Sequence, residues 1–302
     1  MEASGVTSPA VLPAHVGGAR QIVADYVELT KPKVQSLLLL TTVCTMLVAG
    51  DPSVGLIALT VLGGYLSAGG AGAVNHYFDR DIDALMTRTA GRPVPAGRVA
   101  PRAALIYGCV LALLSFVLLT ATVNVLAASL AFCGFLGYVF VYTVWLKRRT
   151  PQNIVIGGAA GAVPPLVGWA AVTGGLGGMP LYLFAIVFFW TPPHFWSLSL
   201  LMKKEYERVG VPMLPVVRGE AETRKQILLY SVLLWAVTQL PFCAGGLGTT
   251  YLVSSLVLGG MFIAGAVTLY RRADRRSALR LYLFSLAYLA LLFGAMVLDV
   301  KL

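Results

Sequence analysis

Charged residues are scarce in this chain. Asp, Glu, Lys and Arg make up 12% of its 302 residues and hydrophobic residues make up 58%, whereas soluble domains carry about 25% charged residues. This composition excludes an ordinary soluble domain. It predicts an integral membrane protein.

Acidic residues are the scarcer of the two signs, with 13 Asp and Glu against 23 Lys and Arg and a net charge of +10. In a soluble chain this excess would suggest a nucleic-acid partner. Here the basic residues stand between long apolar runs, as they do in the cytoplasmic loops of membrane proteins. We therefore expect no nucleic acid as a partner, and we expect attraction to anionic membrane lipid.

Cysteine is also rare, and its spacing is typical of neither a metal site nor a disulfide framework. All four cysteines lie inside apolar runs, where we expect them to pack as small hydrophobic residues: Cys44, Cys109, Cys133 and Cys243. Residues 1–30 lack the continuous apolar stretch of a signal peptide. We expect no cleavable signal there, but a cytosolic amino-terminal tail over residues 1–23 and a single transmembrane domain over residues 24–302.

Nine apolar runs are long enough to cross a membrane as helices. Their expected limits are 34–50, 54–75, 102–120, 124–146, 153–173, 180–201, 226–244, 250–270 and 279–298. A short amphipathic helix over Ala24 to Lys33 should lead into the first run and end at Thr30-Lys31-Pro32. Glycines at small-xxx-small spacing allow helices to approach closely. The predicted fold class is all-α, a polytopic membrane bundle of nine transmembrane helices with a central cavity open to the cytoplasmic face.

The distribution of Lys and Arg predicts the orientation of the bundle. If the amino end is cytosolic, nine spans place every Lys and Arg except Lys301 on the cytoplasmic side. The connections on the opposite side are short and lack both residue types. This asymmetry supports an odd number of spans and cytoplasmic placement of the charged loops.

The most polar stretch of the chain is residues 75–98, between the second and third runs. On a helix, Asn75, Asp79 and Asp83 stand four and eight residues apart and share one face, while Asp81 lies on the opposite side. Two carboxylates and an amide oxygen on one face suit Mg²⁺, which prefers oxygen ligands and keeps positions for water and phosphate. The alternative is a solvated loop with local ion pairs.

Basic residues near this stretch could bind phosphate. Arg88 and Arg92 are four residues apart and could contact the same phosphates in bidentate fashion. Lys147 follows the fourth run, in a Lys-Arg-Arg cluster that by itself is most often a topological anchor. Asn153 and the glycines and prolines after it predict irregular backbone, which is tolerated at membrane depth where it lines a cavity.

The sixth run contains Pro192-Pro193, which should disrupt its helical hydrogen bonds. His194 follows, beside Phe195 and Trp196. It could contact a flat aromatic substrate, ligate a metal or act in proton transfer, although a single histidine is more often a structural residue. A second polar segment begins at Lys203 on the same side as the aspartates.

The spacing of Asn75, Asp79 and Asp83, followed by Arg88-Thr89 and Arg92-Pro93, resembles the first signature of the UbiA superfamily of intramembrane prenyltransferases. Within that superfamily, the chain resembles the branch that farnesylates haem b in three segments: Leu146 to Asn153, Pro192 to Trp196 and Gly210 to Pro215. The resemblance covers about residues 25–298. It departs from most of the superfamily at Lys203, Lys204 and Glu205, where a second aspartate-rich motif is usual.

The resemblance implies transfer of a farnesyl group from farnesyl diphosphate to a vinyl group of haem b, in a bacterial cytoplasmic membrane. It implies Mg²⁺ as cofactor, held by Asp79 and Asp83 with support from Asn75. The residues expected to bind the diphosphate are Arg88, Arg92, Lys147 and Lys203. The residues expected at the haem or substrate pocket are His194, Phe195, Trp196 and Asn153. A haem A synthase is an expected partner, because it would take up the product.

Two other functions fit parts of the sequence. A chlorophyll- or quinone-type prenyltransferase would share the bundle and the first motif, but should carry a second Asp-x-x-x-Asp, which residues 201–210 lack. A secondary transporter could also show irregular helices and polar groups in the membrane. Against a transporter, the charged residues lie at the ends of the spans and not near the bilayer midplane.

Overall fold

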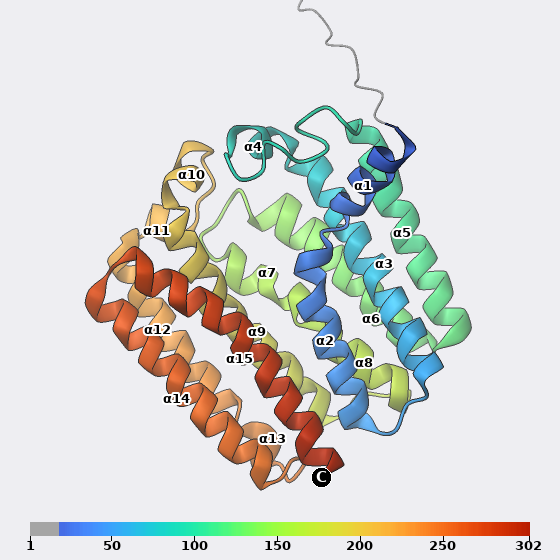
Figure 1. The fold of residues 1–302 in the computed structure, drawn as a ribbon, viewed down its shortest axis with the longest axis vertical. Coiled ribbons are helices and arrows are strands. Elements are labelled where there is room, and N and C mark those ends of the chain that lie inside the picture. Colours follow the sequence, from blue (N-terminus) through green and yellow to red (C-terminus); the bar gives the residue numbers. More distant parts are fainter. Residues whose placement is uncertain (1–17) are drawn as a thin grey trace, which may run out of the picture.

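A computed structural model describes residues 18–302 of the chain (Figure 1). This part of the chain is built of helices without a β-strand, and nine of its helices are long and apolar enough to cross a membrane. The predicted all-α bundle of nine membrane-spanning helices is confirmed over the described residues. The tail predicted over residues 1–23 lies mostly outside the described residues.

The nine spans follow the predicted order, some of them as two consecutive helical segments. They are α2 (Pro32–Ala49), α3 (Val54–Phe78), α5 (Pro101–Thr122), α6 (Val125–Leu136) with the π-helix η1 (Gly137–Leu146), α7 (Asn153–Gly161) with α8 (Val163–Thr173), α9 (Gly178–Leu201), α12 (Gly219–Val237) with α13 (Leu240–Cys243), α14 (Thr249–Arg272) and α15 (Arg275–Lys301). Four shorter helices are α1 (Ala19–Leu29), α4 (Arg80–Leu85), α10 (Lys203–Arg208) and α11 (Leu214–Val217). Figure 1 shows α1, α4 and α10 at the same end of the bundle.

Two helix boundaries differ from the sequence prediction by five residues or more. The seventh span begins at Gly219 and not near residue 226. Its first two turns are helical although they are polar, whereas the expected limit was based on apolar residues. The amphipathic helix α1 begins at Ala19, five residues before the expected start. It ends at Thr30-Lys31-Pro32 as predicted, where Lys31 adopts a left-handed backbone conformation with φ 53°.

Close packing through glycine joins α3 to α5, the pair with the most extensive contact. A Cβ atom added at Gly108 would lie 2.6 Å from the carbonyl oxygen of Gly70 and 2.9 Å from the backbone nitrogen of Val74. Only glycine allows the two backbones to approach so closely. The predicted role of small residues in helix packing is confirmed at this crossing.

The α9 helix runs through the middle of the bundle, against α7, α12 and α15. Pro192 and Pro193 lie inside it, yet the helix continues to Leu201. The predicted disruption is therefore confined to the two hydrogen bonds that prolines cannot donate. The hydroxyl groups of Thr191 and Ser197 donate to nearby carbonyl oxygens of the same helix, those of Val187 and Pro193.

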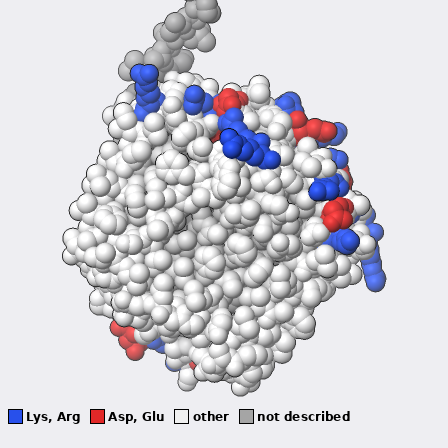
Figure 2. All heavy atoms as spheres, turned by 180° about the vertical axis from the view of Figure 1, so that it is seen from behind, with Lys and Arg blue, Asp and Glu red and all other residues white. Residues whose placement is uncertain are grey.

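Charged side chains gather at one end of the molecule, over α1, α4 and α10 and along the flank below them, while a broad face of the bundle is uncharged (Figure 2). At the other end, Lys301 pairs with Asp51. This separation is the one predicted from the loops. All four cysteines are free. Only Cys44 is buried, so the expected packing role does not extend to the other three, which are exposed on the outer surface.

Candidate active site

The polar stretch after the second span forms one buried face, as the spacing predicts. Asn75 lies in the last turn of α3 and Asp83 in α4, and Asp79 joins the two helices. Helical hydrogen bonding continues across the junction, since the Asp79 N–H donates to the Asn75 carbonyl oxygen and the Asp83 N–H to that of Asp79. The side chains of Asn75, Asp79 and Asp83 are buried, with 3%, 1% and 3% exposure.

Asp81 points the other way and is exposed. Its carboxylate accepts two hydrogen bonds of 2.6 Å from the guanidinium group of Arg148. Hydrogen bonding to Arg148 lowers the pKa of Asp81 to about 2. The sequence separated Asp81 from the other two carboxylates correctly, but it did not identify Arg148 as the ion-pair partner.

Each member of the buried face contacts a cation from another part of the chain. Lys147 Nζ lies 2.5 Å from Asp79 Oδ2, and Arg92 Nη1 lies 2.6 Å from Asp83 Oδ2. Lys31 Nζ donates to Asn75 Oδ1 at 2.6 Å. Because buried carboxylates are costly without a partner, these contacts explain how the cluster is tolerated inside the protein.

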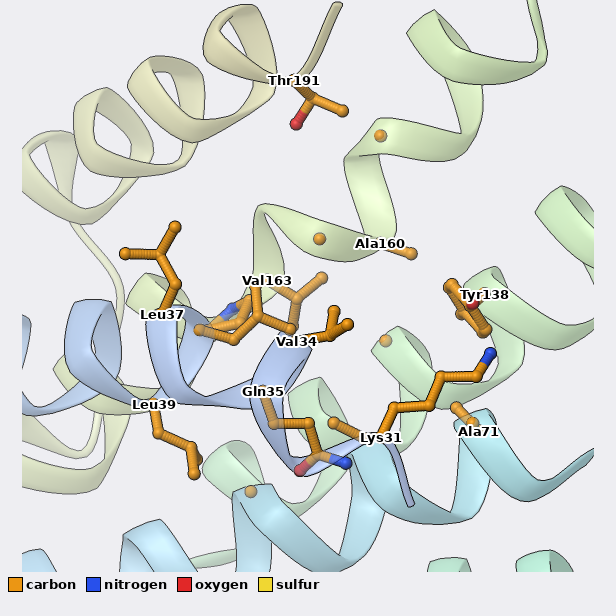
Figure 3. Close-up of a pocket in the computed structure, with 18 of the residues that line it drawn as sticks. Lys31, Val34, Gln35, Leu37, Leu39, Ala71, Tyr138, Ala160, Val163 and Thr191 are labelled. Carbon is orange, nitrogen blue, oxygen red and sulfur yellow. The ribbon is translucent and has the colours of Figure 1, made fainter. Parts of the chain in front are cut away.

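Lys31 is the site residue that the sequence did not predict. Its amine extends into the interior towards Tyr138 (Figure 3). Burial, together with the charge of Arg92, lowers the pKa of Lys31 to about 7. The one signal in the sequence was its place between a short helix and Pro32, where the chain must turn.

Asp79 has one oxygen without a hydrogen-bond partner. Asn75 Nδ2 donates to Asp79 Oδ2 at 2.6 Å, and Asn75 Nδ2 also donates to Thr143 Oγ1 at 3.1 Å. Asp79 Oδ1 is buried and has no hydrogen-bond partner among the described residues, although Arg148 Nη2 lies 3.9 Å from it. A buried oxygen of this kind indicates a place for a ligand or ion.

Two of the predicted phosphate-binding residues are not part of this cluster. Arg88 lies exposed in the turns after α4, and Lys203 pairs with Glu220 at 3.1 Å. The segments that carry them still lie at the same end of the bundle, because Arg208 of α10 donates to the carbonyl oxygen of Leu85 in α4. In α10, Glu205 Oε2 is a second buried carboxylate oxygen without a partner in the described chain.

A cavity of about 430 Å³ opens beside the cluster. Its lining is mostly apolar and comes from α2, α3, α6, η1, α7, α8, α9 and α15. Lys31 belongs to both the cluster and the lining. The irregular backbone predicted after Asn153 borders the cavity at the junction of α7 and α8. The π-helix η1, which the sequence did not predict, borders the cavity as well.

His194 and Phe195 line the cavity, but Trp196 and Asn153 do not. Trp196 stands about 200° around the helix from His194, and it packs instead against Tyr230 in the core. Asn153 is buried and donates from Nδ2 to the Thr150 carbonyl oxygen at 2.7 Å. These two expectations are therefore corrected, because both side chains serve the local structure.

His194 lies between two aromatic rings. The ring centroids of Trp190 and Tyr282 lie 4.3 Å and 5.0 Å from the centroid of the His194 ring, and both rings are nearly parallel to the imidazole. His194 Nδ1 lies 2.6 Å from the hydroxyl oxygen of Ser285. The sequence singled out His194 but neither Tyr282 nor Ser285, since both come from α15, about 90 residues later.

The buried polar side chains include donors for a metal ion. Within residues 18–302, no three side chains of His, Cys, Asp and Glu cluster as a metal site by themselves. The buried face offers two carboxylates and an amide oxygen. One of the carboxylate oxygens, Asp79 Oδ1, has no hydrogen-bond partner in the described chain. This set fits Mg²⁺, which is commonly held by one or two carboxylates and completed by water and substrate phosphate.

The fold and the site define a class of protein: an intramembrane helical bundle in which a carboxylate and amine cluster adjoins an apolar cavity. Residues 37–292 match the UbiA prenyltransferase family. The chain belongs to this family.

Several relatives carry the same name, protoheme IX farnesyltransferase. The chain is 55% identical to the one of Chloroflexus aurantiacus over 93% of its own length and 48% of the relative's. It is 54% identical to the one of Symbiobacterium thermophilum, over 93% of this chain and 95% of the relative. The chain thus spans about half the length of some relatives and nearly all of others.

Solved structures share the fold at lower sequence identity. A digeranylgeranylglyceryl phosphate synthase structure matches with a TM-score of 0.77 at 20% identity, over 93% of this chain and all of that chain. A UbiA homolog from Archaeoglobus fulgidus bound to DMAPP and Mg²⁺ matches with a TM-score of 0.68 at 16% identity, over 90% of this chain and 99% of that chain.

Proposed function

We propose that the chain transfers the farnesyl group of farnesyl diphosphate to a vinyl group of haem b, giving haem O and diphosphate. The relatives named above support this activity. The observation that carries it is the position of Lys31, which contacts Asn75 in the buried cluster and lines the apolar cavity. A diphosphate at the cluster would therefore place an attached prenyl chain in the cavity.

In this proposal Asp79 and Asp83 hold Mg²⁺, with support from Asn75. When bound, the ion would neutralise charge on the leaving diphosphate. Lys147 and Arg92 hold the two carboxylates in place through the buried pairs described above. Together with Arg88 and Lys203 at the same end of the bundle, they are the proposed cations for the diphosphate oxygens.

The reaction breaks the allylic C–O bond, and the electron pair leaves with the diphosphate. The terminal vinyl carbon bonds to the farnesyl carbon, while water adds to the inner vinyl carbon and loses a proton. The apolar lining would limit access of other water to the cation-like intermediate. We assign the porphyrin side of the cavity to His194 and Phe195.

We also propose that the charged end of the bundle faces the cytoplasm of a bacterial membrane, and that a haem A synthase receives the product. The positive-inside rule supports the orientation. With the native cysteines replaced, Gly91→Cys should react with a membrane-impermeant thiol reagent only from the cytoplasmic side, and Gly177→Cys only from the other side. Labelling of both from one side would contradict the orientation.

The activity is tested by extracting haems from a bacterial host that lacks its own haem O synthase. Expression of the chain should produce haem O, and the Asp79→Asn variant at equal membrane abundance should not. Accumulation of haem b alone with the unchanged chain, at verified expression and with farnesyl diphosphate present, would contradict the proposal.

A further inference from the structure

We propose that Ser285 positions His194 so that Nε2 of the imidazole binds the haem iron of the acceptor substrate. This inference rests on the proposed function, because it names the residue that would hold that substrate. It assigns a specific role to a serine that lies on α15, outside the motifs identified in the sequence.

The hydrogen bonds around Ser285 define the tautomer of His194. The Ser285 side chain is fully buried, and its hydroxyl donates to the carbonyl oxygen of Tyr282 at 2.6 Å. A hydroxyl has one hydrogen, so the 2.6 Å contact with His194 Nδ1 uses Ser285 Oγ as the acceptor. His194 Nδ1 therefore carries the proton, and Nε2 of the neutral ring carries the lone pair.

The orientation of the His194 ring is fixed on both faces. Trp190 and Tyr282 stack on it, with interplanar angles of 17° and 27°. Trp190 is itself held by a 2.8 Å hydrogen bond from its Nε1 to the carbonyl oxygen of Ser285. Tilting the imidazole out of its plane would break both stacks. A 180° flip within the plane would place a carbon beside Ser285 and lose the hydrogen bond, so Nδ1 stays on Ser285.

The opposite edge of the imidazole is available for a ligand. His194 lines the cavity, and its one side-chain hydrogen bond in the described structure is the one from Nδ1. Neutral imidazole with a bare nitrogen is a common ligand of haem iron, and the hydrogen bond at its other nitrogen orients it and raises its basicity. The cavity wall thus presents one oriented iron ligand among aromatic and aliphatic side chains.

The test is titration of ferric haem into the purified chain in detergent, followed by its absorption spectrum. The unchanged chain should show a spectrum of histidine ligation. His194→Ala should lose it, and free imidazole should restore it by entering the space between Trp190 and Tyr282. Ser285→Ala should weaken haem binding roughly 10-fold or more, as expected for loss of a hydrogen bond to a metal-bound histidine.

Two controls separate positioning from folding. Ser285→Ala keeps the backbone carbonyl that anchors Trp190, so the aromatic stack remains. Ser231→Ala removes another buried serine hydroxyl, one that donates only to Ile227 in its own helix, and should leave haem binding unchanged. In turnover, Ser285→Ala should raise the KM for haem and leave the KM for farnesyl diphosphate unchanged.

A spectrum of His194→Ala with bound haem identical to that of the unchanged chain would overturn the assignment, even if haem O is formed. Equal haem affinity of Ser285→Ala and Ser231→Ala would overturn the role of Ser285. Failure of the unchanged chain both to bind haem and to form haem O would instead overturn the proposed function and this inference with it.

Discussion

Lys147 Nζ lies 2.5 Å from Asp79 Oδ2, and both groups are shielded from solvent, with exposures of 13% and 1%. The two residues are brought together by the packing of the π-helix η1 against the end of α3. The other oxygen of Asp79 has no hydrogen-bond partner in the described chain, and Arg148 Nη2 lies 3.9 Å from it. This oxygen can therefore still accept a hydrogen bond or a metal ion.

Replacement of Asp79 or Asp83 by Asn should reduce turnover by about 10² or more, because it removes a negative charge from the proposed metal site while keeping the shape of the side chain. Asp81→Asn is the matched control, since Asp81 is exposed and faces away. Turnover at equal expression should separate the three variants. Similar mild losses in all three would show that Asp79 and Asp83 hold no catalytic metal and serve only their buried ion pairs.

Lys31→Gln should raise the KM for farnesyl diphosphate by roughly 10-fold, the effect of losing one charge-assisted hydrogen bond of about 1.5 kcal/mol. Arg20→Gln, an exposed position on α1, should leave both kinetic constants unchanged. Steady-state kinetics with varied farnesyl diphosphate measure the difference. An unchanged KM in Lys31→Gln would mean that the lysine supports Asn75 and does not contact the diphosphate.

The ion pair of Asp81 and Arg148 should contribute to stability only above acidic pH. Since the folded-state pKa of Asp81 is lowered to about 2 from 3.8, its contribution is complete above about pH 4 and disappears as the pH falls through 2. The pair is exposed, so Asp81→Asn should cost less than about 1 kcal/mol at pH 7. Thermal unfolding in detergent from pH 5 to 8 should show a constant difference between variant and unchanged chain.

Gly108→Ala should destabilise the bundle by about 1–3 kcal/mol, because the added methyl group would overlap the backbone of α3. Gly260→Ala is the control, since a Cβ atom at Gly260 meets no atom within 4 Å. Thermal unfolding of both variants should show a loss for the first alone. An equal unfolding temperature would mean that α3 and α5 can separate without cost.

The features that were predictable from the sequence are those set by residues close together in the sequence. Nine apolar runs define nine spans, and the spacing of Asn75, Asp79 and Asp83 defines one helical face. The partners of these residues were not predictable in the same way. The pairing of Lys147 with Asp79 depends on how two helices pack.

The residues that line the cavity were also only partly predictable from the sequence. A sequence motif could select residues 194–196 together, but a helix turns by about 100° per residue, so His194 faces the cavity and Trp196 faces the core. His194 meets Tyr282 and Ser285 of α15 there, while Trp196 meets Tyr230 of α12. Ser285 itself carries no sequence signal, because a serine in an apolar helix is ordinary.

At Lys31, the left-handed backbone conformation lowers stability, while the side-chain amine is proposed to support activity. This conformation costs a residue with a side chain about 1–2 kcal/mol, and glycine adopts it without that cost. Lys31→Gly should therefore relieve backbone strain while it removes the amine that contacts Asn75. A selection for thermal stability alone would favour the loss of this lysine, and selection for turnover would retain it.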